Sequence, residues 1–595
     1  MHPTPTLLAL LVLLLPLASL ASAQTPEPVV EIYDPGGLSW FRQRTHRVFM
    51  TMPLAASSVG PAGETSGREA WGEDVDRVVL GDGQFERMVC DLVGPDAVRD
   101  ARIEVLGEHF WVSAPPDLQP RIGVALESLL AALSASVLLE LHTLPPAALR
   151  AAPAKVLSGA QVDALLEQHS PLATVRAPAR LGRGARLISA RRRSLVTEFD
   201  VEVAQEMFSG DPLVKQLLLG LEVGVRVHAA SAGRLLMIVG GRHMELLGEV
   251  RELSTGSARV LPGVKDPYTV KTGTLQLPRS RSTVTRGSAV VTDGGGLLVG
   301  HDGSSGGLWL VRATRRRPQM TWKVGGSDLL ALAELLTPPV VGGWPTVGPP
   351  NPSGFGSGVG GFDDDDTEKP EAFIDVNRIE GWLMRDADTE PDRPPFIHAL
   401  GDYVLSGGPE AVRKRIREST LAWSRRFART VELDVRIGAV PPGTPTSPAD
   451  AARLASVLPL AAGTAGREGD DAAVIGGEEE AILKDHDIEI AQGATGPDPV
   501  VDSVFTGFHV GGRLDVAPGG DVVMRGRVFW QERVHPTRQY ALESGGFGDL
   551  DQVDLAHVQM RDLWTLKPGQ WTLLAFAPVE GTGHAMACVV RARVR

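Results

Sequence analysis

Residues Phe199–His228 read FDVEVAQEMFSGDPLVKQLLLGLEVGVRVH, and residues His486–Asp515 read HDIEIAQGATGPDPVVDSVFTGFHVGGRLD. At an offset of 287 residues and with no gap, the 29 positions that begin at Asp200 hold 11 identities, where average composition gives about two. Internal similarity at a fixed offset is typical of repeat architectures. The sequence therefore predicts one β-rich unit that occurs twice.

The elements expected before this stretch also recur in order, because each half holds strand, helix and strand segments. They are Arg102–Leu106, Phe110–Ser113, a helix that reaches Leu133 and Val137–His142 in the first half, and Tyr403–Ser406, a helix that reaches about Arg429 and Val431–Ile437 in the second. We predict an α+β, mainly β fold of two tandem repeats. Each repeat is a small α+β module followed by a β-rich module.

These patterns divide the chain into seven expected parts. They are a signal peptide at 1–23, an N-terminal extension at 24–84 with one strand at Val29–Tyr33, the first α+β module at 85–142, the first β-rich module at 143–318, a Gly/Pro/Asp linker at 319–370, the second α+β module at 371–437, and the second β-rich module at 438–595.

Composition and the N-terminal region bound the class of protein. With 595 residues the chain is too long for one hydrophobic core, and its net charge of −13 disfavours nucleic acid as a partner. Leu7–Leu20 is apolar, too short to span a bilayer, and followed by Ala21-Ser22-Ala23, as in a cleaved signal peptide. We expect export to the periplasm or outer membrane.

Cys90 and Cys588 occupy unmatched positions in the two halves, which favours two buried free thiols; a single disulfide between them is the alternative.

Glycine, proline and aspartate at particular positions predict local turns, bulges and strands. Leu221–His228 alternates apolar and polar residues, as in a half-buried strand, and Gly224 with its counterpart Gly511 indicates a bulge or a close backbone approach. The repeated Asp211-Pro212 is typical of a turn, as is its counterpart Asp498-Pro499. Asp293-Gly294 predicts a hairpin between the strands on either side.

Motifs that resemble catalytic or binding sites lie in the wrong context. Gly356–Gly361 fits G-x-G-x-x-G but lies in the linker, without the strand and helix that a dinucleotide site needs. Gly303–Gly307 fits G-x-S-x-G around Ser305, but it joins two strands, and nothing ties it to His584. Asp363–Asp366 lacks calcium-loop spacing. We expect no catalytic residues, no cofactor and no metal site, and hence a protein that is not an enzyme.

Arginine clusters recur along the chain. They are Arg191–Arg193, Arg315–Arg317 and the series from Arg413 to Arg429 on the second expected helix. A charged, solvated outer face explains them most simply. The alternative is that they dock onto an acidic neighbour.

Residues of the first repeat resemble a known family. Leu277-Pro278, the segment Ser282–Thr285 and the run Asp293–Gly300 are similar to the Leu-Pro, Thr-rich strand and Asp-Gly-Gly turn of secretins, the outer-membrane ring proteins of type II and type III secretion. Ala177-Pro178 resembles the segment before them, and the module at 102–133 is similar to the small ring-forming domains of that family. The resemblance covers about 85–318, and 371–595 more weakly.

The chain also departs from that family. Only His301–Gly307 separates the Gly-Gly turn from the last strand, and an aromatic content of 5% fits poorly with the aromatic girdles of a lipid-facing barrel. The resemblance implies a non-enzymatic structural or assembly component of the bacterial cell envelope, without its own pore. Its partners would be further copies or other envelope and secretion proteins, and entry of a strand into a membrane is left open. The alternatives are a stand-alone periplasmic binding or scaffold protein and an exported hydrolase that uses Ser305.

Overall fold

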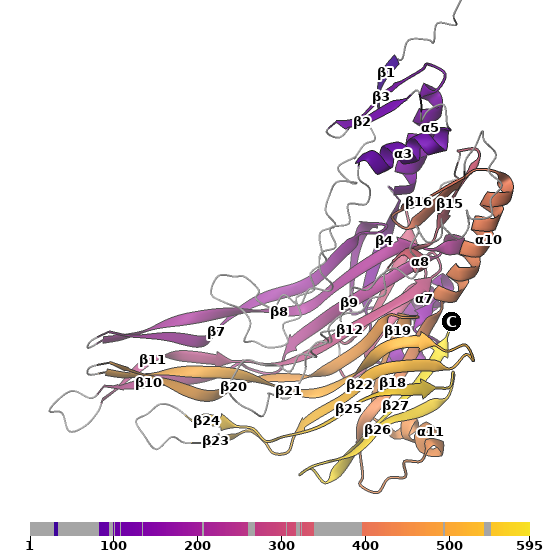
Figure 1. The fold of residues 1–595 in the computed structure, drawn as a ribbon. Helices are drawn as coiled ribbons and strands as arrows, with labels where there is room; N and C mark the ends of the chain where they lie inside the picture. Colours follow the sequence, from indigo (N-terminus) through magenta and orange to yellow (C-terminus); the bar gives the residue numbers. More distant parts are fainter. Residues whose placement is uncertain are drawn as a thin grey trace, which may run out of the picture.

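Two β-sheets packed face to face form the body of the molecule (Figure 1). The computed structural model describes residues 29–33, 82–94, 99, 101–106, 109–133, 135–204, 207–259, 268–304, 306–316, 322, 324–337, 395–491, 494–540 and 549–595. The predicted signal peptide, the acidic run and the G-x-G-x-x-G segment lie outside these residues, as does Ser305. The mainly β, α+β fold class predicted from the sequence is confirmed.

Sheet I contains the long strands. In spatial order it consists of β25 (Leu555–Leu566), β22 (Val522–Arg533), β21 (Ala494–Val516), β20 (Asp471–Ala491), β12 (Arg279–Val291), β9 (Leu235–Leu246), β8 (Met207–Ala229) and β7 (Gly184–Ala204). Sheet II consists of β26 (Trp571–Val579), β27 (His584–Val594), β18 (Thr430–Val440), β19 (Leu460–Arg467), β13 (Gly296–His301), β14 (Leu308–Arg315), β4 (Ser136–Thr143) and β6 (Ala173–Arg180), with β5 (Val156–Leu157) also paired to β13.

Small modules and short connections complete the fold. The first module has β1 (Val29–Tyr33), β3 (His109–Ala114), β2 (Arg102–Leu106), α3 (Asp82–Val93) and α5 (Gln119–Leu133). The second has β15 (Ser327–Ala331), β17 (Tyr403–Gly407), β16 (Phe396–Leu400), α8 (Ala333–Leu336) and α10 (Glu410–Phe427). The remaining elements are α6 (Ala147–Ala151), α7 (Gly159–Gln168), η2 (Ser231–Gly233), β10 (Arg251–Arg259), β11 (Tyr268–Leu277), η3 (Pro448–Asp450), α11 (Ala451–Val457), β23 (Arg538–Tyr540) and β24 (Leu550–Gln552).

The two similar segments lie in two long hairpins, β7–β8 and β20–β21, which extend beyond the body in the same direction (Figure 1). The bounds of β20 and β21 equal those of β7 and β8 plus 287. Each hairpin changes register once, between Val196 and Glu198 and between Leu483 and Asp485, which is again the same place. Gly220 and Gly507 also correspond, and both have a positive φ.

The paired proline positions are not turns, contrary to the sequence prediction. Pro212 lies opposite Phe199 within β8, and Pro499 lies opposite His486 within β21. At these positions β8 and β21 have a ladder partner on one side only, because β9 and β22 reach just Gly220 and Gly507. A proline, which lacks a backbone N–H, is tolerated on such an open side.

The turn at Gly294 does not form the predicted hairpin. It carries the chain from β12 in sheet I to β13 in sheet II, and the N–H of Gly294 donates to Ala313 O of β14. The turn at Gly569 connects β25 to β26 in the same way, with its N–H donating to Ala592 O. Each glycine has a φ of 73° or 80°, which a side chain strains, so both sheet crossings need glycine.

Two further predictions from the sequence differ from the structure. The strands expected to close the α+β modules, β4 and β18, lie in sheet II instead, because their buried faces complete the core between the sheets. The expected linker at 319–370 is ordered over part of its length, since β15 pairs with β17 and α8 follows it. Leu332, Leu335 and Leu336 pack against α10, which gives this segment its own apolar contacts.

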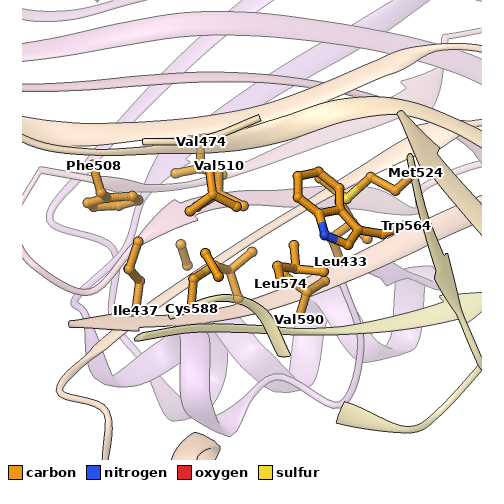
Figure 2. Packing of buried hydrophobic residues seen from close by; sticks show 14 of the residues in the cluster. Leu433, Ile437, Val474, Phe508, Val510, Met524, Trp564, Leu574, Cys588 and Val590 are labelled. Atoms are coloured by element: carbon orange, nitrogen blue, oxygen red, sulfur yellow. The ribbon is translucent and has the colours of Figure 1, made fainter. Parts of the chain in front are cut away.

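The space between the two sheets is filled by apolar side chains from both halves. Figure 2 shows Trp564 of sheet I packed near Leu433, Leu574 and Val590 of sheet II. Cys588 lies in this cluster as a buried free thiol, and Cys90 is buried and free in the first module, as predicted. Burial raises the pKa of the Cys90 thiol to about 11 and raises that of Cys588 further.

Close backbone approach explains Gly511, as the sequence indicated. A Cβ at this position would lie 2.5 Å from Ala472 O, so only glycine fits. The bulges of the two hairpins lie elsewhere, at residues 196–198 and 483–485.

Candidate assembly interface

The two halves of the chain meet edge to edge within both sheets. In sheet I, β12 pairs antiparallel with β20 from Arg279 opposite Glu480 to Arg286 opposite Ala473. In sheet II, β13 pairs with β19. We call this contact the internal junction. A strand near the end of the first half is therefore joined to the first sheet I strand of the second half.

Ion pairs cross the internal junction, and in each of them the positive charge comes from the first half. The arginines are on β12 and the carboxylates are on β20. Arg281 Nη2 lies 2.9 Å from Glu478 Oε1, and Arg279 pairs with Glu478 and lies 3.9 Å from Glu480. Burial raises the pKa of Glu478, but hydrogen bonds from Arg281 and Arg279 outweigh it and hold that pKa below its usual value.

A buried ion pair anchors the other end of the same junction. The side chains of Arg467 and Asp470 have no exposed surface, and Arg467 Nη2 lies 2.9 Å from Asp470 Oδ1. The Ser288 hydroxyl of β12 donates to Asp470, and Arg467 N donates to the Ser288 oxygen at 2.8 Å. The guanidinium also donates to the carbonyls of Glu334 and Thr337 at 3.2 Å each. This network links both halves and α8.

Two further buried polar contacts tie the second α+β module to the first β-rich module. Glu334 of α8 is fully buried and accepts hydrogen bonds from Ser231 N and from the Ser424 hydroxyl of α10. His228 Nδ1 lies 2.7 Å from Asp402 Oδ1. Buried carboxylates require such donors, so these contacts fix the module against the end of β8.

The strand Leu221–His228 is buried more deeply than the half-buried strand predicted, since Arg226 is its one exposed residue. Glu222 is 1% exposed, and it accepts hydrogen bonds from Arg186 Nε at 2.6 Å and from Arg242 Nε at 3.2 Å. Alternation of polar and apolar residues misled the sequence prediction here, because Glu222 finds charged partners on the adjacent strands and His228 pairs with Asp402.

His301 lies buried where sheets I and II approach each other at the junction. Its Nδ1 accepts a hydrogen bond from Gly303 N at 2.9 Å, so the ring proton is on Nε2, which lies 2.8 Å from Thr283 Oγ1. The ring meets Phe508 of the second half edge to face, with centroids 5.5 Å apart. The pKa of His301 is lowered to about 4, mainly by burial; Asp302 opposes this shift, and Arg281 and His243 add to it.

We expect acid to destabilise the protein through His301. The unfolded chain binds a proton near pH 6.5 that the folded protein binds only near pH 4, so stability is lost as the pH falls from about 6.5 towards 4, by up to about 3 kcal/mol. His301→Gln removes this contribution. Urea unfolding midpoints between pH 7 and 4.5 should therefore fall less steeply in His301→Gln than in the wild type. The exposed His557→Gln is the control, and equal slopes for wild type and His301→Gln would contradict the assignment.

The outer strands of sheet I, β7 and β25, have no ladder partner on their far sides among the described residues. Exposed apolar side chains lie on both, since Ile188 is 45% exposed on β7 and Leu563 is 61% exposed on β25. Arg191–Arg193 are all exposed on β7. An unpaired strand edge offers backbone N–H and C=O groups to another strand.

Three arginines of the cluster from Arg413 to Arg429 form ion pairs inside the molecule. Arg413 and Arg417 of α10 pair with Asp328 of β15 at 3.1 and 3.0 Å, and Arg429 pairs with Glu468.

Of the two residues considered for a hydrolase, His584 pairs with Glu532, and Ser305 lies outside the described residues.

Within the described part of the chain, no group of three or more His, Cys, Asp or Glu side chains is placed to hold a metal ion. In the same residues, no helix has both the length and the apolar character to cross a membrane.

No protein-family model and no curated protein sequence matches this chain. Solved structures similar to it include the Salmonella SPI-1 type III secretion injectisome secretin InvG, at 10% identity and a TM-score of 0.20 over 37% of this chain and 78% of that chain. The Salmonella injectisome basal body proteins InvG, PrgH and PrgK match with 10% identity and a TM-score of 0.22 over 50% and 70% of the two chains. The ETEC pilotin–secretin complex AspS–GspD matches with 9% identity and a TM-score of 0.18 over 50% and 69%. Identities and TM-scores of this size assign the chain to no family.

Proposed function

We propose that this protein is a non-enzymatic structural component of the bacterial cell envelope that associates with further copies of itself in a head-to-tail manner. The internal junction carries this proposal. At this junction β12, near the end of the first half, pairs with β20, the first sheet I strand of the second half. If the two halves are copies of one unit, each half has one edge of the β12 kind and one edge of the β20 kind. The counterparts of these strands at the outer edges, β25 and β7, remain open within the described residues.

The proposal includes tandem duplication of one unit. Two kinds of observation support it: β7, β8 and β9 coincide with β20, β21 and β22 at an offset of 287 residues, and their pairing registers agree. If β25 of one copy pairs with β7 of the next, every unit has the same neighbours. Such heterologous contacts close into rings or continue as filaments.

The relation to secretins and the absence of a pore belong to the same proposal. They rest on the Leu277-Pro278 segment, on the Gly-Gly turn at Gly294 and on the short segment between His301 and Gly307. The envelope location rests on the predicted signal peptide. Fractionation of cells into cytoplasmic, periplasmic and outer-membrane pools tests it, and recovery only in the cytoplasm would contradict it.

Self-association is tested on the full exported chain, by size-exclusion chromatography with light scattering and by sedimentation over a hundredfold range of concentration. We expect species at integer multiples of the monomer mass that grow with concentration. A strictly monomeric protein at the highest concentration would reject self-association and favour the alternative of a stand-alone periplasmic scaffold.

A further inference from the structure

The open edges of sheet I can be compared residue by residue with the strands of the internal junction. Leu247 N donates to Arg279 O, and Val534 N donates to Asp554 O, so Asp554 at the start of β25 corresponds to Arg279 of β12. On the other side, β20 corresponds to β7 at the offset of 287 residues, so Glu480 corresponds to Arg193.

The charges at these corresponding positions are reversed on both strands. Where the internal junction has Glu478–Glu480 on β20, the open strand β7 has Arg191–Arg193. Where it has Arg279 as the first residue of β12, the open edge has Asp554, the residue directly before β25. The internal pair of Arg279 with Glu480 thus becomes Asp554 with Arg193 when the register of the junction is transferred to two copies.

We propose that β7 is the docking edge for β25 of a second copy, with Arg193 opposite Asp554, and that the reversed charges keep this contact from exchanging with the internal junction. The inference rests on the proposed head-to-tail association, and it adds the identity of the two strands, their register and the basis of their selection. The occupant of the basic edge is therefore another copy of this chain.

The reversal matters because the two incorrect pairings bring like charges together. If β12 of one copy paired with β7 of another in the same register, Arg279 would face Arg193 and Arg281 would face Arg191. Opposite charges across an antiparallel pair stabilise it, and like charges directly opposite destabilise it. A repulsive element against the wrong partner is a general route to specificity.

If β25 paired with β20 of another copy, Asp554 would face Glu480. Both exchanges are therefore disfavoured by the same reversal, whereas the internal junction and the proposed contact each bring opposite charges together.

The exposed apolar residues fit the same contact. The transferred register places Leu563 of β25 opposite Gly184 of β7, and the exposed Ile188 would be covered by the same strand. It also places Arg186 opposite Arg561, but Arg186 is already held by Glu222.

Charge reversal at the two docking positions tests the proposal on the full chain. Arg193→Glu and Asp554→Arg are each expected to weaken self-association about tenfold, since each turns an attractive cross-strand pair into a repulsive one. The double variant Arg193→Glu with Asp554→Arg restores the attraction and is expected to return to within about threefold of the wild type. Arg415→Glu, which makes the same charge change on the exposed face of α10, is the control and is expected to leave association unchanged.

The outcomes separate this inference from the proposed function. A wild type that never associates rejects the proposed function, and the inference with it. A wild type that associates while both single variants match Arg415→Glu, or a double variant no better than the singles, rejects the inference alone. Circular dichroism of each variant confirms that the fold is retained, as exposure of Arg193 and partial exposure of Asp554 lead us to expect.

Discussion

Asp470→Ala is expected to lower the free energy of unfolding by about 3–5 kcal/mol, because it leaves a buried guanidinium without its carboxylate. Arg467 and Asp470 have no exposed side-chain surface, and both contact Ser288 of the first half. The carbonyls of Glu334 and Thr337 would be the acceptors that remain among the hydrogen bonds described above. The loss therefore falls on the contact between the halves.

The measurement for Asp470→Ala is the midpoint of the first urea-induced transition, followed by tryptophan fluorescence and by limited proteolysis. Asp515→Ala is the matched control, since Asp515 is 47% exposed beside Arg513 and surface ion pairs contribute little. We expect early cleavage between the halves in Asp470→Ala only. Equal midpoints for the two variants would show that the buried pair is not a main determinant of the internal junction.

Trp309→Ala is expected to cost about 3–5 kcal/mol by opening a cavity between the sheets. Trp309 of β14 is fully buried in the core of the first half, and its Nε1 donates to Gly306 O at 2.7 Å. Its ring packs closely against β9 of the opposite sheet, because a Cβ at Gly241 would lie 3.0 Å from Trp309 Cζ3. Neighbouring backbone packed this closely cannot collapse fully into the space left by the ring.

The unfolding of Trp309→Ala is followed by far-ultraviolet circular dichroism, which does not depend on the fluorescence of the removed ring. Trp111→Ala provides the comparison, because Trp111 is 41% exposed on β3 of the first small module. A loss for Trp309→Ala no larger than that for Trp111→Ala would mean that the core around β14 repacks.

Much of the fold could be predicted from local patterns. Val29–Tyr33 forms the predicted strand, and the similarity between the two 29-residue segments locates two hairpins with the same register change. Local patterns failed where neighbours from other segments of the chain determine whether a residue is buried. Glu222 is buried because Arg186 and Arg242 lie beside it on adjacent strands, and spacing along one strand carries no information about those partners.

The arginine clusters show the same difference between what local sequence predicts and what the folded chain decides. The clusters at Arg191–Arg193 and Arg413–Arg429 look alike in sequence, yet the second pairs with Asp328 and Glu468 inside the molecule while the first stays exposed. The partners of Asp470 and His228 come from segments 182 and 174 residues away, so only folding brings them together.

By itself, the sequence determined that the chain is mainly β and that its two halves resemble each other, since side-chain periodicity and internal similarity are properties of short stretches. Only the tertiary structure decided which strands share a sheet, that β12 and β20 join the halves, and which edges stay open. The reason is that strand pairing is a contact between distant segments. Backbone hydrogen bonds are the same for every partner, and the choice among partners depends on charges and packing that meet only in the folded chain.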